Sequence, residues 1–97
     1  LGASEQMLMV SGFTDDKPVG GSNRQFADNW ELSAQRALTV TRSLIDEGVP
    51  AGNIFAAAFG SQQPVASNAD ADGRARNRRV EMAPVPKSSR VGKEGNG

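Results

Sequence analysis

The sequence predicts a small α+β domain in which one amphipathic helix packs on a mixed sheet. Three features indicate this fold: an apolar run at residues 6–13, an amphipathic stretch that begins at Asp28, and a second apolar run at residues 54–59. The chain has 97 residues, of which 37% are hydrophobic, and it contains no cysteine. A chain of this length supports one modest core, without disulfides to reinforce it. The predicted element order is β-α-β-(short α)-β, arranged as a two-layer sandwich.

The first element is a strand over residues 6–13. Leu8, Met9 and Val10 form a continuous apolar run, which is typical of a strand buried on both faces. Residues 17–23 follow with proline, glycine and asparagine, the residue types of turns. The chain therefore leaves the strand through a loop before it enters the helix.

The helix is predicted to begin at Asp28, because Asp28 and Glu31 have the spacing of a capping box. Gly48 and then Pro50 supply its end. Between them, apolar and small residues recur at the i, i+3, i+4 spacing of one helical face, which we expect to pack on the sheet. These residues are Trp30, Ala34, Ala37, Leu38, Thr41, Leu44 and Ile45.

The C-terminal half is predicted to add two strands and a short helix. Residues 54–59 lie between turn residues and favour a strand. We then expect a loop over 60–73, a short helix over 74–79 and a final strand over 80–83. From Pro84 the sequence has almost no apolar content, which is typical of a disordered tail. The domain is accordingly predicted to span residues 1–83, and the tail residues 84–97.

Residues 68–73 imitate the start of a calcium-binding loop. Asn68, Asp70 and Asp72 offer oxygen ligands at the first, third and fifth positions, and glycine follows at the sixth. The twelfth position, which should be a bidentate glutamate, is Arg79, a cation that would repel calcium. We therefore predict no metal site and no cofactor, and interpret Asp72 and Gly73 as a turn.

A basic cluster suggests nucleic-acid binding as an alternative function. Its members are Arg74, Arg76, Arg78 and Arg79. No aromatic residue lies among them to stack on bases, and the chain as a whole balances 11 basic with 11 acidic residues. An ion-paired or solvated helix face is the better interpretation, so no nucleic-acid partner is expected.

An enzymatic function is not expected either. The chain has no histidine and no cysteine, and no serine lies in a nucleophile-elbow context. Asp15 and Asp16 are adjacent, and neighbouring residues of an extended chain point in opposite directions, which argues against an acid/base pair.

A different polar set is more informative. Asn29, Ser33 and Arg36 recur at the spacing of one helical face, near the end of the first strand, which Asp15 follows. An arginine fork and an isolated carboxylate together suit a zwitterionic amino-acid head group, with its carboxylate and its ammonium. A simple ion pair between Asp15 and Arg36 explains the same spacing equally well. The residues alone do not separate these two interpretations.

Six motifs, in order along the chain, bear on this choice. They are G-x-T-D at 12–15, N-x-x-L-S at 29–33, Arg36-Ala37, Gly48-Val49-Pro50, the F-G and P-V pairs near Gly60 and Val65, and Asn77-Arg78-Arg79-Val80-Glu81. Through these motifs the sequence, from about Gly12 to Met82, closely resembles OmpA-like peptidoglycan-binding domains, and among them the MotB branch of flagellar stator proteins. This resemblance favours the head-group interpretation over the simple ion pair.

The resemblance implies a periplasmic, non-enzymatic domain that binds peptidoglycan non-covalently through the diaminopimelate residue of the stem peptide. It assigns the ligand's ammonium to Asp15 and its carboxylate to Arg36. Thr14 and Asn29 would shape the pocket, and Arg78 or Arg79 would lie near its rim. Phe13 stands where the MotB branch often has histidine.

The resemblance also implies parts that lie outside these residues. The family domain usually begins with a strand and a helix ahead of the strand at 6–13, so we expect this fragment to be N-terminally incomplete. We likewise expect attachment to the inner or outer membrane through a region not present in this chain. A homodimer is compatible with the resemblance.

Overall fold

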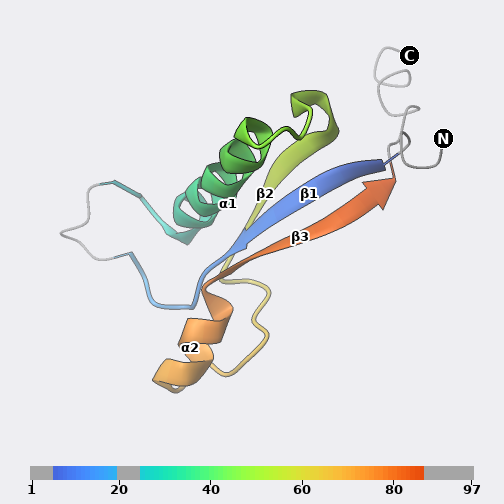
Figure 1. The fold of residues 1–97 in the computed structure, drawn as a ribbon. Coiled ribbons are helices and arrows are strands. Elements are labelled where there is room, and N and C mark those ends of the chain that lie inside the picture. The colour runs from blue at the N-terminus through green and yellow to red at the C-terminus, as the bar shows by residue number, and fades with distance from the viewer. Residues whose placement is uncertain (1–5, 20–24, 87–97) are drawn as a thin grey trace, which may run out of the picture.

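The computed structural model describes residues 6–19 and 25–86 and has the predicted α+β architecture. Strand β1 (Gln6–Phe13) is followed by helix α1 (Asn29–Asp46), a short 3₁₀ helix η2 (Ala51–Asn53) and strand β2 (Ile54–Gly60). Helix α2 (Ala71–Asn77) and strand β3 (Arg79–Pro86) complete the order. Figure 1 shows α1 lying along one face of the sheet and α2 beyond one end of it.

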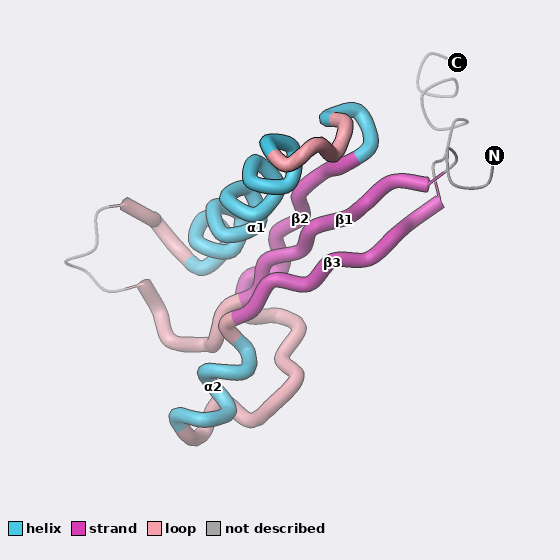
Figure 2. Tube along the Cα trace, in the orientation of Figure 1, coloured by secondary structure: helices cyan, strands magenta, loops and turns pink. Residues whose placement is uncertain are grey.

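The three strands form a mixed sheet with β1 in the middle (Figure 2). Strand β2 runs parallel to β1, and β3 runs antiparallel to β1 along its whole length, from Gln6 opposite Pro86 to Phe13 opposite Arg79. The prediction of a strand at 6–13 is therefore confirmed. Its burial differs from the expectation, because only the second half, Val10 to Phe13, is buried.

The core lies between α1 and the sheet, where Val10, Ala37 and Ile54 are buried against one another. At the level of Gly12 the helix backbone lies very close to β1. A Cβ on Gly12 would lie 2.0 Å from the carbonyl oxygen of Ser33, so a side chain cannot be accommodated there. The glycine of the G-x-T-D motif thus permits the close approach of α1 to the strand.

Helix α1 begins and ends at the predicted signals. Asp28 is the N-cap, and its Oδ1 accepts from the backbone N–H of Glu31 at 3.0 Å. The Glu31 side chain reaches back to the N–H of Ala27 at 2.9 Å, which completes a variant of the capping box. After the helix, Gly48 has a φ of 121°, a conformation that favours glycine.

The predicted apolar stripe of α1 is wrong at its first position. Trp30 is 51% exposed, whereas Ser33, which was assigned to the polar face, is fully buried. Because the helix approaches β1 so closely at Gly12, the position above the strand requires a small residue, and Ser33 meets that requirement. Ala37 and Thr41 continue the buried stripe, and Ala34, Leu38, Leu44 and Ile45 are half-buried.

Two boundaries in the C-terminal half also differ from the prediction. Helix α2 begins at Ala71, because the Asp70 side chain caps it by accepting from Gly73 N–H at 2.7 Å; the expected turn at Asp72 and Gly73 is therefore the first helical turn. Strand β3 continues to Pro86, since prolines are tolerated on an edge strand. The predicted tail can begin only after Pro86, and residues 87–97 lie outside the described residues.

None of the helices in the described ranges is long and apolar enough to cross a membrane.

Candidate functional site

Asp15 lies in the loop that leaves β1, and this loop is held in place by Thr14 and Asn29. The backbone N–H of Thr14 donates to the carbonyl of Gly60 at 2.8 Å, and its hydroxyl donates to the carbonyl of Asp15 at 2.8 Å. From the first turn of α1, the Asn29 side chain donates to the carbonyl of Lys17 at 3.0 Å and to that of Asp15 at 3.4 Å. The loop carrying the carboxylate is therefore fixed to both β2 and α1.

The carboxylate of Asp15 is buried and pairs with Arg78. Residue Asp15 is 7% exposed, and Arg78 Nη1 lies 2.7 Å from Asp15 Oδ2. The other oxygen, Oδ1, accepts from the backbone N–H of Lys17 at 3.1 Å. The Arg78 side chain remains 43% exposed. In this ion pair the carboxylate is therefore buried and fixed by hydrogen bonds, whereas the guanidinium side is accessible to solvent.

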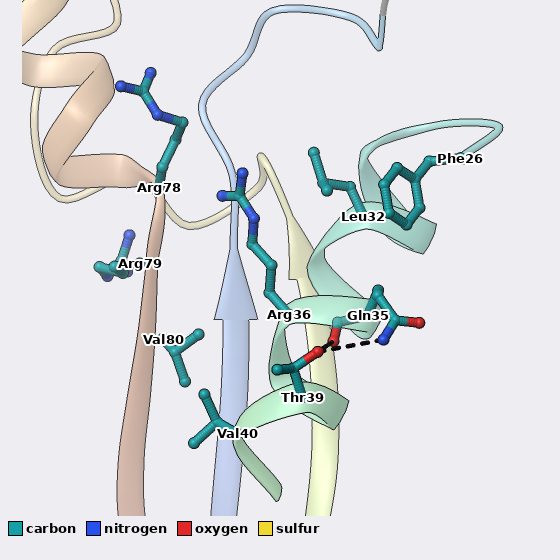
Figure 3. A pocket seen from close by; sticks show the side chains of 9 residues that line it. All are labelled: Phe26, Leu32, Gln35, Arg36, Thr39, Val40, Arg78, Arg79 and Val80. Carbon is teal, nitrogen blue, oxygen red and sulfur yellow. Dashed lines mark hydrogen bonds between the residues drawn. The ribbon is translucent and has the colours of Figure 1, made fainter. Parts of the chain in front are cut away.

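The simple ion pair between Asp15 and Arg36 is not what the structure contains. Asp15 pairs with Arg78, and Arg36 has no salt-bridge partner within residues 6–19 and 25–86. Figure 3 shows the Arg36 side chain extending away from α1 towards the side on which Arg78 lies. A positive charge that has no salt-bridge partner in the described part of the chain is suited to an anionic ligand group.

Arg36 and Arg78 line the same cavity, which has a volume of about 630 Å³. Its remaining walls come from α1, from the residues just before it and from the start of β3: Phe26, Leu32, Gln35, Thr39, Val40, Arg79 and Val80. In Figure 3, Val40 and Val80 face each other across the cavity, while the guanidinium of Arg36 lies beyond them towards the end of the strand. The cavity is therefore apolar along its length and cationic at one end.

Arg79 is held by internal contacts. Its guanidinium carbon lies 3.8 Å from the centre of the Phe13 ring, and its Nε donates to the Glu81 carboxylate. Its remaining nitrogens donate to the carbonyls of Gln63 and Asn77. Since Glu81 compensates the charge of Arg79 and Asp15 compensates that of Arg78, the charge of Arg36 is the one left uncompensated among these five groups.

All six residues predicted for the site are connected in the fold. Thr14, Asn29 and Arg78 contact Asp15 or its loop, and Arg78 shares the cavity with Arg36 and Arg79. The predicted polar face of α1 is nevertheless divided, because Ser33 turns towards the sheet. The apolar walls formed by Phe26, Leu32, Val40 and Val80 were not predicted. The helical periodicity of α1 could have indicated that Val40 lies on an apolar face. It could not have shown that Val40 and β3 line the same cavity.

Asn77 is a buried polar residue whose role the sequence did not reveal. It is fully buried, and its Oδ1 accepts from the backbone N–H groups of Val65 and Ala66 at 2.8 and 3.0 Å. Its Nδ2 donates to the carbonyl of Ala66 at 2.9 Å and to Asn68 Oδ1 at 2.8 Å. Asn77 therefore ties the loop after β2 to the end of α2, immediately before Arg78.

The basic cluster at 74–79 does not form a free cationic surface. Arg74 donates to the carbonyl of Asn68 at 3.1 Å, and Arg78 and Arg79 form the ion pairs with Asp15 and Glu81. Of the cluster, Arg76 alone has no such partner in the described part of the chain. This arrangement agrees with the ion-paired interpretation and gives no support to nucleic-acid binding.

Comparison with known proteins identifies relatives of this chain in sequence and in fold. Residues 2–78 match the model of the OmpA family. Motility protein B of Bacillus subtilis is 39% identical over 83 residues, which cover 84% of this chain and 31% of that protein. The peptidoglycan-binding protein ArfA of Mycobacterium tuberculosis is 42% identical over 75 residues, covering 77% of this chain and 21% of that protein.

A solved structure agrees with these sequence relatives. The periplasmic domain of Helicobacter pylori MotB superimposes with a TM-score of 0.78 at 33% identity, covering 95% of this chain and 56% of that one. The chain therefore spans about a third or less of the length of the two protein relatives and just over half of the solved domain.

Proposed function

Because this chain belongs to the OmpA family and has an OmpA-like domain of the MotB type, we propose that it is a non-catalytic peptidoglycan-binding module. In this proposal it anchors an envelope protein to the cell wall from the periplasmic side. The ArfA relative, which is named as a peptidoglycan-binding protein, supports the choice of ligand. The observation that carries the proposal is that Arg36, which has no salt-bridge partner among the described residues, shares a cavity with Arg78, the partner of the buried Asp15 carboxylate.

We further propose that the ligand group is the free end of diaminopimelate in the stem peptide. That end is a zwitterion, with a carboxylate for Arg36 and an ammonium for Asp15. An arginine fork matches a carboxylate with two parallel hydrogen bonds, and a carboxylate accepts strongly from an ammonium. A ligand with both groups therefore gives Arg36 an oppositely charged partner and Asp15 a second one beside Arg78, whereas a simple anion pairs only with Arg36.

The other predicted residues have supporting parts in this proposal. Arg78 holds the Asp15 carboxylate in position, and its exposed guanidinium lies where the ligand enters. Thr14 and Asn29 fix the loop that presents Asp15. Arg79, held by Phe13 and Glu81, forms a rigid wall of the cavity.

Binding of meso-diaminopimelate-containing muropeptides, measured by calorimetry, tests the proposal. We expect Asp15→Ala and Arg36→Ala each to weaken binding on the order of 10- to 100-fold, because each removes a charge-assisted contact of roughly 1.5–3 kcal/mol. Thermal unfolding of Arg36→Ala should stay near the parent value, since Arg36 has no ion pair to lose in the described residues and alanine favours the helix.

Arg42→Ala is the matched control, because Arg42 is an exposed arginine on the same helix and does not line the cavity. Its affinity for the muropeptide should equal that of the parent chain. Unchanged binding in either Asp15→Ala or Arg36→Ala would refute the assignment of these two residues.

A further inference from the structure

Trp30 is the chain's single tryptophan, and it is half exposed at the N-terminal end of α1. Large aromatic side chains carry much apolar area and dominate the energetics of cores and interfaces, so an exposed indole beside a binding loop is a candidate contact for a ligand. Its neighbour Asn29 belongs to the candidate site, where it donates to the carbonyls of Asp15 and Lys17. Trp30 therefore lies next to the proposed stem-peptide site and takes no part in the contacts described there.

The indole is supported by the end of β2. A Cβ on Gly60 would lie 3.3 Å from both Cδ2 and Cε3 of Trp30, so the ring rests directly over the Gly60 backbone. The buried hydroxyl of Ser33 joins the same two residues, because it accepts from Gly60 N–H at 3.0 Å and donates to the carbonyl of Trp30 at 3.0 Å. One part of the indole ring therefore packs on the backbone of Gly60, while about half of the surface of Trp30 stays accessible to solvent.

Trp30 lines a cleft of about 330 Å³ that carries polar groups around the ring. We call it the Trp30 cleft; the residues that line its other walls include the exposed Asp16, together with Pro18, Asn29 and Ser61. This volume is at the lower end of the roughly 300–1,000 Å³ of small-molecule sites, in which an aromatic wall is combined with a few polar groups. The cleft therefore combines an aromatic wall with residues that carry a carboxylate, an amide and a hydroxyl group.

We infer that the Trp30 cleft binds one N-acetylated pyranose ring of the glycan strand. The apolar C–H face of a pyranose stacks on an indole, and its hydroxyl and acetamido groups hydrogen-bond to carboxylate, amide and hydroxyl side chains such as those of Asp16, Asn29 and Ser61. The inference rests on the proposed function, because a glycan strand reaches this cleft only if its stem peptide occupies the neighbouring site. It assigns to the domain a second contact with the same polymer.

The intrinsic tryptophan fluorescence of the wild-type chain can detect this contact without an added label, because Trp30 is its only tryptophan. We would titrate it with two probes: a disaccharide-tripeptide of N-acetylglucosamine and N-acetylmuramic acid carrying diaminopimelate, and the same tripeptide without sugar. The disaccharide probe should change the tryptophan emission and bind more tightly than the free tripeptide. Equal affinities, or an equal change in emission with both probes, would overturn the inference.

Variants then separate this contact from the stem-peptide site. Trp30→Ala should weaken binding of the disaccharide probe roughly 3- to 10-fold, the scale of one aromatic stacking contact, and leave the free tripeptide unaffected. Trp30→Phe should lose less affinity for the disaccharide probe than Trp30→Ala does. Phe55→Ala, a change at another exposed aromatic residue, is the matched control and should alter neither affinity.

The outcomes distinguish the two proposals. Suppose that Arg36→Ala binds neither probe, whereas Trp30→Ala still binds the disaccharide probe more tightly than the free tripeptide, by the same factor as the parent chain. The proposed function then stands and the glycan contact is wrong. If the parent chain binds neither probe, both are wrong. Should Trp30→Ala fail to fold, Trp30→Phe and the parent's fluorescence still decide, because a missing sugar preference in the parent contradicts the inference directly.

Discussion

At the scale of single residues, Asn77 is where we expect stability to be most sensitive to a polar change. Its amide makes four hydrogen bonds with Val65, Ala66 and Asn68 and is fully buried. Asn77→Ala leaves these groups without partners, so the free energy of unfolding should fall by about 2–4 kcal/mol. Chemical denaturation measures this loss. The half-buried Asn53 is the control, and a similar effect of Asn53→Ala would contradict the assignment.

At the residue scale, the sequence predicted residues that the fold brings together at the candidate site, but it did not predict which of them form pairs. The spacing on the helix and the family motifs both led to Asp15 and Arg36. Neither indicated that Asp15 would pair with Arg78, which is 63 positions away along the chain, because such a contact depends on how β3 returns beside β1. Likewise, periodicity did not indicate that Ser33 would be buried at the close approach of α1 to Gly12 while Trp30 stays half exposed.

At the scale of elements, the packing of α1 on β1 depends on Gly12. A Cβ there would lie 2.0 Å from Ser33 O and 3.3 Å from Ala37 N, both backbone atoms that cannot move without shifting the helix. Gly12→Ala should therefore lower the free energy of unfolding by about 1–3 kcal/mol, as overpacking does. It should also weaken muropeptide binding, because Arg36 on α1 moves away from the loop of Asp15.

Gly52→Ala provides the comparison for this glycine. A Cβ on Gly52 meets no atom within 4 Å, so the same chemical change should shift the free energy of unfolding by less than about 0.5 kcal/mol. Thermal and denaturant unfolding of both variants check the pair. An equally small effect of Gly12→Ala would mean that the contact between α1 and β1 is not tight in solution.

Element boundaries show why sequence reasoning was better for α1 than for the C-terminal half. Helix α1 has strong local signals at both ends, in the Asp28 cap and in Gly48. Strand β3 is set instead by its partner, since it pairs along the full length of β1 even though Pro84 and Pro86 locally disfavour a strand. Tertiary pairing here outweighs local propensity, and one sequence alone does not reveal it.

At the scale of the whole molecule, the described part of the fold combines a small core with several exposed large apolar side chains. The buried hydrophobic residues of the described chain are few: Val10, Phe13, Ala37 and Ile54. Beside them, the cavity between α1 and β3 is lined by Leu32, Val40 and Val80, and β3 is an edge of the three-stranded sheet. The expectation that a further strand and helix complete the family domain stays a prediction, and this open side is where we would place them.

An open edge beside an apolar groove should make the isolated chain self-associate. Met82 is 55% exposed on this edge strand, opposite Val10 and therefore on the face that α1 covers only in part. Unpaired strand edges pair with other chains, and a lysine on the edge prevents this at little cost in stability. We expect sedimentation velocity to show concentration-dependent association of the parent chain, and Met82→Lys to abolish it without lowering the melting temperature.

Because so small a core supports only a marginal fold, the parent should also melt below about 65 °C, the upper end for mesophile domains. A chain that stays monomeric at every concentration and melts cooperatively above that temperature would show that the sheet needs no further partner.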